Sequence, residues 1–157
     1  MPLEVGTNTF VSVVRVDSLL EYRIDAEEWT DAVLARKEKA AATATAILNG
    51  MDWLGVAAEQ SQSLAFPREG TYYDSLVGAN VQLSEIPLRI EKGTSELALH
   101  LLKNEDLLDE TGSVDDIELG PIKLKDIQDP SIIPHNVYKL IRPLLIRGNS
   151  KLWWRAN

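Results

Sequence analysis

The side chains of this sequence that could support catalysis or bind a metal ion are two histidines and three pairs of neighbouring carboxylates. His100 lies in a predicted helix and has neither an acidic residue nor a second histidine four positions later, which is the spacing of helical metal sites. His135 follows Pro134 at the start of another predicted helix. We therefore expect both imidazoles to be ordinary helix residues rather than ligands or catalytic bases.

The carboxylate pairs could in principle hold Mg²⁺ or Ca²⁺, because both ions prefer oxygen ligands. The pairs are Glu27–Glu28, Asp109–Glu110 and Asp115–Asp116. The last two fall within residues 105–118, which contain seven acidic side chains and no basic one. The stretch 109–118 does not match the calcium-binding EF-hand pattern. We expect residues 105–118 to be a solvated linker with one helical turn at Leu107–Leu108.

The motifs of common enzyme classes do not occur in the sequence. There is no HExxH, GxxxxGK(S/T), GxGxxG or GxSxG pattern. The chain has no cysteine, which excludes thiolate metal sites and a cysteine nucleophile. A Ser–His–Asp triad assembled only by folding stays open, although nothing in the sequence nominates one. We therefore predict a protein that is not an enzyme and that needs no metal and no cofactor.

Charge is distributed unevenly along the 157 residues. The 16 basic and 24 acidic side chains give a net charge of −8, which argues against a protein that coats DNA with its whole surface. Residues 130–157 hold five of the basic side chains and no acidic one, so the rest of the chain carries 11 basic against 24 acidic. The five are Lys139, Arg142, Arg147, Lys151 and Arg155. This segment also contains Trp153 and Trp154, which could dock onto a partner or close the core as a final strand.

Length and hydropathy favour one domain, or two at most. The N-terminus lacks the basic and apolar regions of a secretory signal. The longest mostly apolar run, Ala40 to Met51, is interrupted by polar residues and is shorter than the roughly 20 residues that span a membrane. We expect a soluble chain that stays where it is made and has no membrane partner.

Apolar residues at helical spacing predict four helices. They cover residues 17–23, 30–51, 86–103 and part of 132–145, where Pro143 interrupts the last one. The second helix is rich in alanine and threonine, so a neighbouring helix could pack closely against it. Asp25 would cap a short helical segment whose first turn contains Trp29, and we expect this tryptophan to fill core.

The remaining segments predict few strands. Residues 9–16 could form a short strand or an extended lead-in, 55–85 lack a sustained period and predict a long loop, and 151–155 look extended. Residues 117–125 alternate around Gly120-Pro121, which favours an edge strand or a turn. The expected fold is mainly α: a small helical bundle with a long inter-helix loop and a C-terminal extension containing short β-strands. Its expected domains are a bundle of residues 1–104, an acidic linker of 105–118 and a docking extension of 119–157.

The most specific motif is Gln-Ser-Leu-Ala-Phe-Pro-Arg-Glu-Gly at residues 62–70. Before it come a helix with Ala44-Thr45 and then Trp53-Leu54-Gly55; after it come Ile86-Pro87 and a helix with Glu96-Leu97-Ala98. This order resembles a family of short proteins from tailed bacteriophages, often labelled DnaT-like single-stranded DNA-binding, that look like head–tail connectors. The resemblance covers roughly residues 10–104 and, more weakly, the C-terminal tail, and the chain has Phe66 where that family usually has tryptophan.

The resemblance implies a structural connector, or adaptor, that is made in the host cytoplasm and located in the virion at the head–tail junction. Its copies would form a ring, expected to be 12-fold, below the portal. Its expected partners are the portal protein, neighbouring copies, the next tail protein and double-stranded DNA that passes through the lumen without specific binding. The residues expected to dock onto the portal are Arg147, Lys151, Leu152, Trp153, Trp154 and Arg155.

The 62–70 motif is expected to anchor a loop or contact a neighbouring subunit rather than to catalyse a reaction. Pro67 biases Phe66 towards an extended conformation, and Phe66 and Leu64, two residues apart, would hold the loop on the bundle. Arg68 would be free to pair with a carboxylate, or would be a plain surface arginine. The anchor residues are therefore Gln62, Leu64, Phe66, Pro67 and Arg68.

Two other functions stay open. The family label taken literally predicts a single-stranded DNA-binding protein, which needs a basic groove with aromatic side chains for stacking. Only residues 130–157 offer that combination, with Trp153–Arg155 as the expected site. The third possibility is a small enzyme or a lysis or regulatory factor, for which the sequence contains no constellation.

Overall fold

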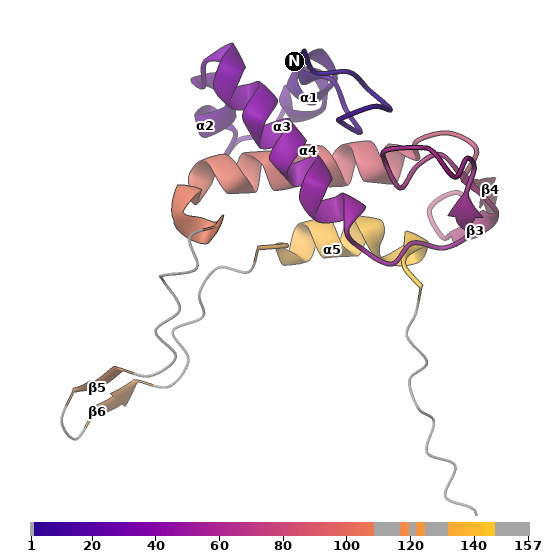
Figure 1. Ribbon diagram of the computed structural model, residues 1–157. Helices are drawn as coiled ribbons and strands as arrows, with labels where there is room; N and C mark the ends of the chain where they lie inside the picture. The colour runs from indigo at the N-terminus through magenta and orange to yellow at the C-terminus, as the bar shows by residue number, and fades with distance from the viewer. Residues whose placement is uncertain (1, 109–116, 120–121, 125–131, 147–157) are drawn as a thin grey trace, which may run out of the picture.

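The computed structural model describes residues 2–108, 117–119, 122–124 and 132–146. This part of the chain is mainly helical, as predicted, and α4 lies at its centre, in contact with α1, α2, α3 and α5. Figure 1 shows α3 crossing α4 and α5 lying along α4. The α-helices are α1 (Val13–Leu20), α2 (Glu27–Thr30), α3 (Leu34–Asn49), α4 (Leu88–Lys103) and α5 (His135–Ile141), and the 3₁₀ helices are η1 (Glu105–Leu108) and η3 (Arg142–Leu144).

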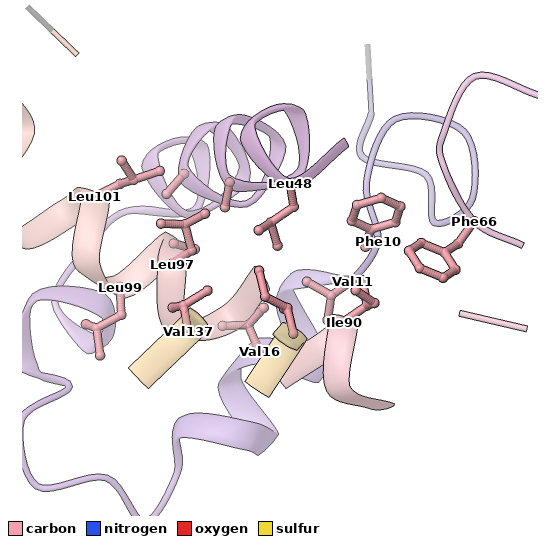
Figure 2. Packing of buried hydrophobic residues seen from close by; sticks show 14 of the residues in the cluster. Phe10, Val11, Val16, Leu48, Phe66, Ile90, Leu97, Leu99, Leu101 and Val137 are labelled. Carbon is pink, nitrogen blue, oxygen red and sulfur yellow. The ribbon is translucent and has the colours of Figure 1, made fainter. Parts of the chain in front are cut away.

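Helix α4 is central because apolar and small residues surround most of its circumference. Nine of its 16 residues are buried. Figure 2 shows Leu48, Leu97 and Val137, from α3, α4 and α5, in one hydrophobic cluster. Gly93 faces α5, and a Cβ at this position would come within 2.9 Å of Cγ2 of Ile141, so the missing side chain lets the two helices approach closely. The extended Pro87 (φ −63°, ψ 144°) precedes the first turn, close to the predicted start.

Small side chains on α3 allow close packing, as its composition predicted. Ala40, Ala41 and Ala44 are buried against the rest of the bundle. Thr45 is also buried, and its hydroxyl accepts a hydrogen bond from the backbone N–H of Phe10 at 3.2 Å and lies 3.2 Å from the hydroxyl of Thr9. The N-terminal segment is therefore fixed to the C-terminal half of α3.

The first helix differs from the prediction. It begins at Val13 rather than at residue 17, because the hydroxyl of Ser12 accepts a hydrogen bond from the N–H of Arg15 and caps it. Likewise, Asp25 does not cap α2, since its carboxylate pairs with Arg23 and Lys103. The expected burial of Trp29 is confirmed: it is 2% exposed, and its indole N–H donates to Asp17 at 2.7 Å.

The prediction of a long loop at 55–85 was wrong, because four short strands lie between α3 and α4. They form two antiparallel pairs: β1 (Val56–Ala57) with β2 (Arg68–Glu69), and β3 (Thr71–Asp74) with β4 (Ala79–Gln82). The buried Leu83 joins the pairs, since its carbonyl accepts from the N–H of Arg68 and its N–H donates to Gly70. Gly55 (φ +74°) lets its own backbone lie close to the backbone of Glu69, because a Cβ at residue 55 would lie 2.2 Å from the carbonyl oxygen of Glu69.

The segments that follow α4 agree in part with the prediction. The helical turn at 107–108 is present as η1, and β5 (Ile117–Leu119) pairs with β6 (Ile122–Leu124) in antiparallel fashion. Helix α5 gives way to η3, which contains Pro143, as predicted. The strands that join the bundle thus lie between α3 and α4 rather than in the C-terminal extension, and the expected extended segment at 151–155 lies outside the described residues. The division into three domains stays a prediction.

No helix in the described part of the chain is long and apolar enough to cross a membrane.

Candidate nucleic-acid interface

The exposed side of α5 and η3 carries four side chains that can bind a nucleic acid. They occupy positions i, i+3, i+4 and i+7 of a helical surface and are all exposed. We call this set the α5 stripe: His135, Tyr138, Lys139 and Arg142. The segment 132–146 contains no acidic residue, so no carboxylate of its own neutralises the stripe.

The opposite side of α5 fixes the orientation of the stripe. Val137, Ile141 and Leu144 are fully buried in the core. On the flank, the amide of Asn136 donates to Glu96 of α4 at 2.9 Å, and Arg89 of α4 donates to the carbonyl of Leu140 at 3.3 Å. Because both ends of the short helix are bonded to α4, the stripe faces solvent as a fixed surface.

Backbone hydrogen bonds also hold the chain after η3. The N–H of Leu54 donates to the carbonyl of Leu144 at 2.9 Å, and the N–H of Ile146 donates to that of Asp52 at 2.9 Å. Between them, Trp53 and Leu145 form an isolated antiparallel bridge. The last described residue is thus held beside the segment that follows α3.

Cations elsewhere in the described structure are largely neutralised. Arg15 pairs with Glu91, Arg36 with Glu105, and Lys37 with Asp17. Arg23 and Lys103 share Asp25, and Arg23 also pairs with Glu96. Lys139 and Arg142 have no carboxylate partner among the residues that the structure describes, which elsewhere holds for Lys39 and Lys92. The stripe therefore offers free positive charge on an otherwise acidic protein.

The predicted anchor loop folds onto the bundle through its aromatic residue. Phe66 is 1% exposed, and its ring meets those of Phe10 (centroids 5.9 Å apart) and Trp53 (5.3 Å) edge to face. The Phe66–Pro67 peptide bond is cis. Leu64 is buried beside them. These contacts join the N-terminal segment, the end of α3 and the loop.

Arg68 has a structural position that sequence reasoning missed. We expected a guanidinium free to pair with a carboxylate; instead it donates hydrogen bonds to four backbone carbonyls. The carbonyls are those of Trp53 (3.2 Å), Leu54 (2.6 Å), Gly55 (2.7 Å) and Ala65 (3.1 Å). Gln62 acts similarly, since its amide N–H groups donate to the carbonyls of Leu64 and Pro67. Both side chains thus provide hydrogen-bond donors to backbone carbonyls that lie outside the β-strands.

A buried ion pair joins the β3–β4 hairpin to α4. Arg89 donates two hydrogen bonds to Asp74, at 2.8 and 2.6 Å, and the Tyr72 hydroxyl donates to the same carboxylate at 3.2 Å. The Arg89 guanidinium holds the pKa of the Asp74 carboxyl well below its usual range, and burial raises the pKa of the Tyr72 hydroxyl. No sequence signal connects these residues, because they come from different elements and meet only after folding.

The six residues expected to dock onto a portal, Arg147, Lys151, Leu152, Trp153, Trp154 and Arg155, lie outside the described residues. Of the two histidines, His100 lies on α4 with Nδ1 3.4 Å from the side-chain nitrogen of Asn104, and His135 begins the α5 stripe. The described residues contain no group of three or more His, Asp or Glu side chains that could hold a metal ion. The sequence analysis treated His135 as an ordinary helix residue and did not single out Tyr138, although the spacing of both residues from Lys139 and Arg142 was visible.

Comparison with protein families gives a match over nearly the whole chain. A family model described as "Putative DnaT-like ssDNA binding protein" matches residues 3–155. No curated protein and no solved structure matches the chain. The family description names single-stranded DNA binding, so the interpretation as a phage head–tail connector was wrong. The partners that we expected of a connector are wrong for the same reason. They were the portal protein, neighbouring copies in a ring, the next tail protein and double-stranded DNA passing through the lumen. The description names binding and no chemical reaction.

Proposed function

The chain belongs to the DnaT-like single-stranded DNA-binding family, and on that premise we propose that it binds single-stranded DNA through the α5 stripe. The observation that carries this proposal is the fixed, unneutralised row of His135, Tyr138, Lys139 and Arg142. Lys139 and Arg142 supply charge for phosphates. Tyr138 is 43% exposed and supplies a face on which a base can stack. His135 can donate a hydrogen bond or stack.

The dimensions of the stripe suit a short stretch of single strand. Its four residues span about 10 Å along a helix that rises 1.5 Å per residue. Stacked nucleotides repeat at about 3.4 Å along a strand, so the stripe can contact about three of them. A longer contact is expected to continue along the basic C-terminal residues, and we include Arg147, Lys151, Leu152, Trp153, Trp154 and Arg155 in the proposed interface on their residue types.

Charge distribution restricts where the strand can lie. Outside residues 130–157 the chain has 11 basic and 24 acidic side chains, so most of the surface repels phosphate. Binding should therefore be confined to the C-terminal part and should weaken steeply with salt. Because stacking needs unpaired bases, single-stranded DNA should bind more tightly than a duplex of the same length.

The first test removes the two cations of the stripe. The double variant Lys139→Ala/Arg142→Ala should bind a labelled single strand more weakly, and the slope of log K against log salt should fall by about 1.4, since each phosphate contact on a single strand contributes about 0.7. Fluorescence anisotropy across a salt series measures both quantities. Arg36→Ala/Lys39→Ala on α3 removes the same charge and should leave the slope unchanged. Equal slopes in all three proteins, or wild type without affinity, would refute the proposal.

The second test separates stacking from charge. Tyr138→Ala should weaken single-strand binding by about 1–3 kcal/mol, the usual contribution of one stacked base, without changing the salt slope. Tyr138→Phe keeps the ring and should bind nearly as the wild type does. Thermal unfolding of both variants checks that the helix is intact. If both variants bound as tightly as the wild type, the base would not stack at this position.

A further inference from the structure

A cavity of about 430 Å³ lies between the segment that follows α3 and Ile146, which comes two residues after η3. It is open to solvent and is lined by Ile146, by residues that follow α3 such as Asp52 and Trp53, and by the loop that contains Glu59 and Ser63. Ile146 comes four residues after Arg142, the last member of the α5 stripe, and its N–H is bonded to the carbonyl of Asp52. The chain therefore runs from the end of the stripe to the wall of the cavity within four residues, and the size of the cavity admits a nucleobase.

Some of the polar side chains that line the cavity make hydrogen bonds within the protein, and others do not. Asn49, Gln62 and Arg68 make hydrogen bonds that hold the loop. The side chains of Asp52, Glu59, Gln60 and Ser63 have no hydrogen-bond or ion-pair partner among the described residues. The unused groups are thus two carboxylates, an amide and a hydroxyl, gathered in one concave surface that the chain reaches four residues after the last cation of the stripe.

This combination of groups suits the base of a nucleotide and not its phosphate. Carboxylates repel phosphate, so the backbone of a bound strand stays on the α5 stripe. The same carboxylates accept hydrogen bonds from exocyclic amino groups, and an aspartate or glutamate accepts from N4 of cytosine. Thymine and uracil present a carbonyl oxygen at that position, which a carboxylate repels.

We propose that the cavity holds one base of the bound strand and that Asp52 and Glu59 favour a base with an exocyclic amino group, cytosine above all, over thymine or uracil. This inference rests on the proposed single-strand binding and adds a specificity to it. Gln60 and Ser63 can complete the contacts, because an amide and a hydroxyl both donate and accept.

The test compares oligo(dC) with oligo(dU) of equal length. The two strands have the same backbone and the same ring size, and they differ because cytosine has an exocyclic amino group where uracil has a carbonyl oxygen. The full-length protein should bind oligo(dC) at least about fivefold more tightly at neutral pH, the discrimination expected of one good base contact. Asp52→Ala/Glu59→Ala should bring the ratio close to one, chiefly by improving oligo(dU) binding. Glu21→Ala/Asp31→Ala removes the same charge from exposed positions that do not line the cavity, and should keep the wild-type ratio.

Each outcome decides between the inference and the function on which it rests. If the wild type bound both strands equally and with salt dependence, the cavity would not select bases, while single-strand binding would stand. A cavity variant that kept the wild-type ratio would also overturn the inference. If neither strand bound, the proposed function itself would fail. Asp52→Ala alone, at an exposed side chain, provides a milder variant in which the ratio should fall part of the way.

Discussion

Replacing Arg89 with methionine should destabilise the fold by about 3–5 kcal/mol, the usual cost of removing one partner of a buried ion pair. The variant leaves the buried Asp74 carboxylate without the two hydrogen bonds that the guanidinium donates. It also removes the bond from Arg89 to the carbonyl of Leu140, which holds α5 to α4. Urea unfolding followed by circular dichroism measures the change.

A double variant distinguishes the unpaired charge from the loss of packing. Arg89→Met/Asp74→Asn has no buried charge at this site, so it should be more stable than Arg89→Met alone. Lys92→Met, on an exposed part of the same helix, should change stability by no more than about 0.5 kcal/mol. An Arg89→Met variant as stable as the wild type would show that the pair contributes nothing to the fold.

The same pair predicts how stability depends on pH. The pKa of Asp74 in the folded protein lies below its ordinary value because Arg89 donates to the charged carboxyl. Its stabilisation is therefore complete above the unfolded pKa, about 4, and is lost as the pH falls below that value towards the folded pKa. The free energy of unfolding of the wild type should thus decrease on acidification below about pH 4, and the decrease should be smaller in Arg89→Met.

Elements with local signals could be predicted from the sequence. The apolar spacing of α3 and α4, and Pro87 and Pro143 at helix ends, depend on residues close together in the chain. The buried side of α5 was also predictable, because Val137, Leu140 and Ile141 follow helical spacing. The concentration of basic residues after residue 130 indicated where the candidate interface would be.

The strands between α3 and α4 have no comparable signal. Strands β1 and β2 have two residues each, too few to show alternation, and β4 is mostly exposed. They form because Gly55 allows a close backbone approach and because Arg68 bonds to carbonyls that folding brings together. The 62–70 motif therefore specifies architecture. The connector function drawn from its resemblance was wrong because the family description names single-stranded DNA binding, which was the alternative.

Phe66→Ala should destabilise the protein by about 3–5 kcal/mol, because it removes a fully buried ring and leaves a cavity that its neighbours cannot fill. The ring contacts both Phe10 and Trp53 edge to face, so its loss weakens the connection of the N-terminal segment and the end of α3 to the loop. Thermal or urea unfolding measures the change. Tyr73→Ala, which removes an aromatic ring that is 61% exposed, should change stability by no more than about 0.5 kcal/mol.

The position of Phe66 also connects stability to the proposed DNA interface. Trp53, against which the ring packs, bridges to Leu145 at the end of η3 and lines the cavity beside Ile146. Phe66→Ala should therefore loosen the cavity more than the α5 stripe, whose buried side packs on α4. At a temperature where the variant stays folded, we expect the preference for oligo(dC) over oligo(dU) to fall while the salt slope stays at the wild-type value. Loss of the salt slope with retention of the base preference would show that the stripe, and not the cavity, depends on this ring.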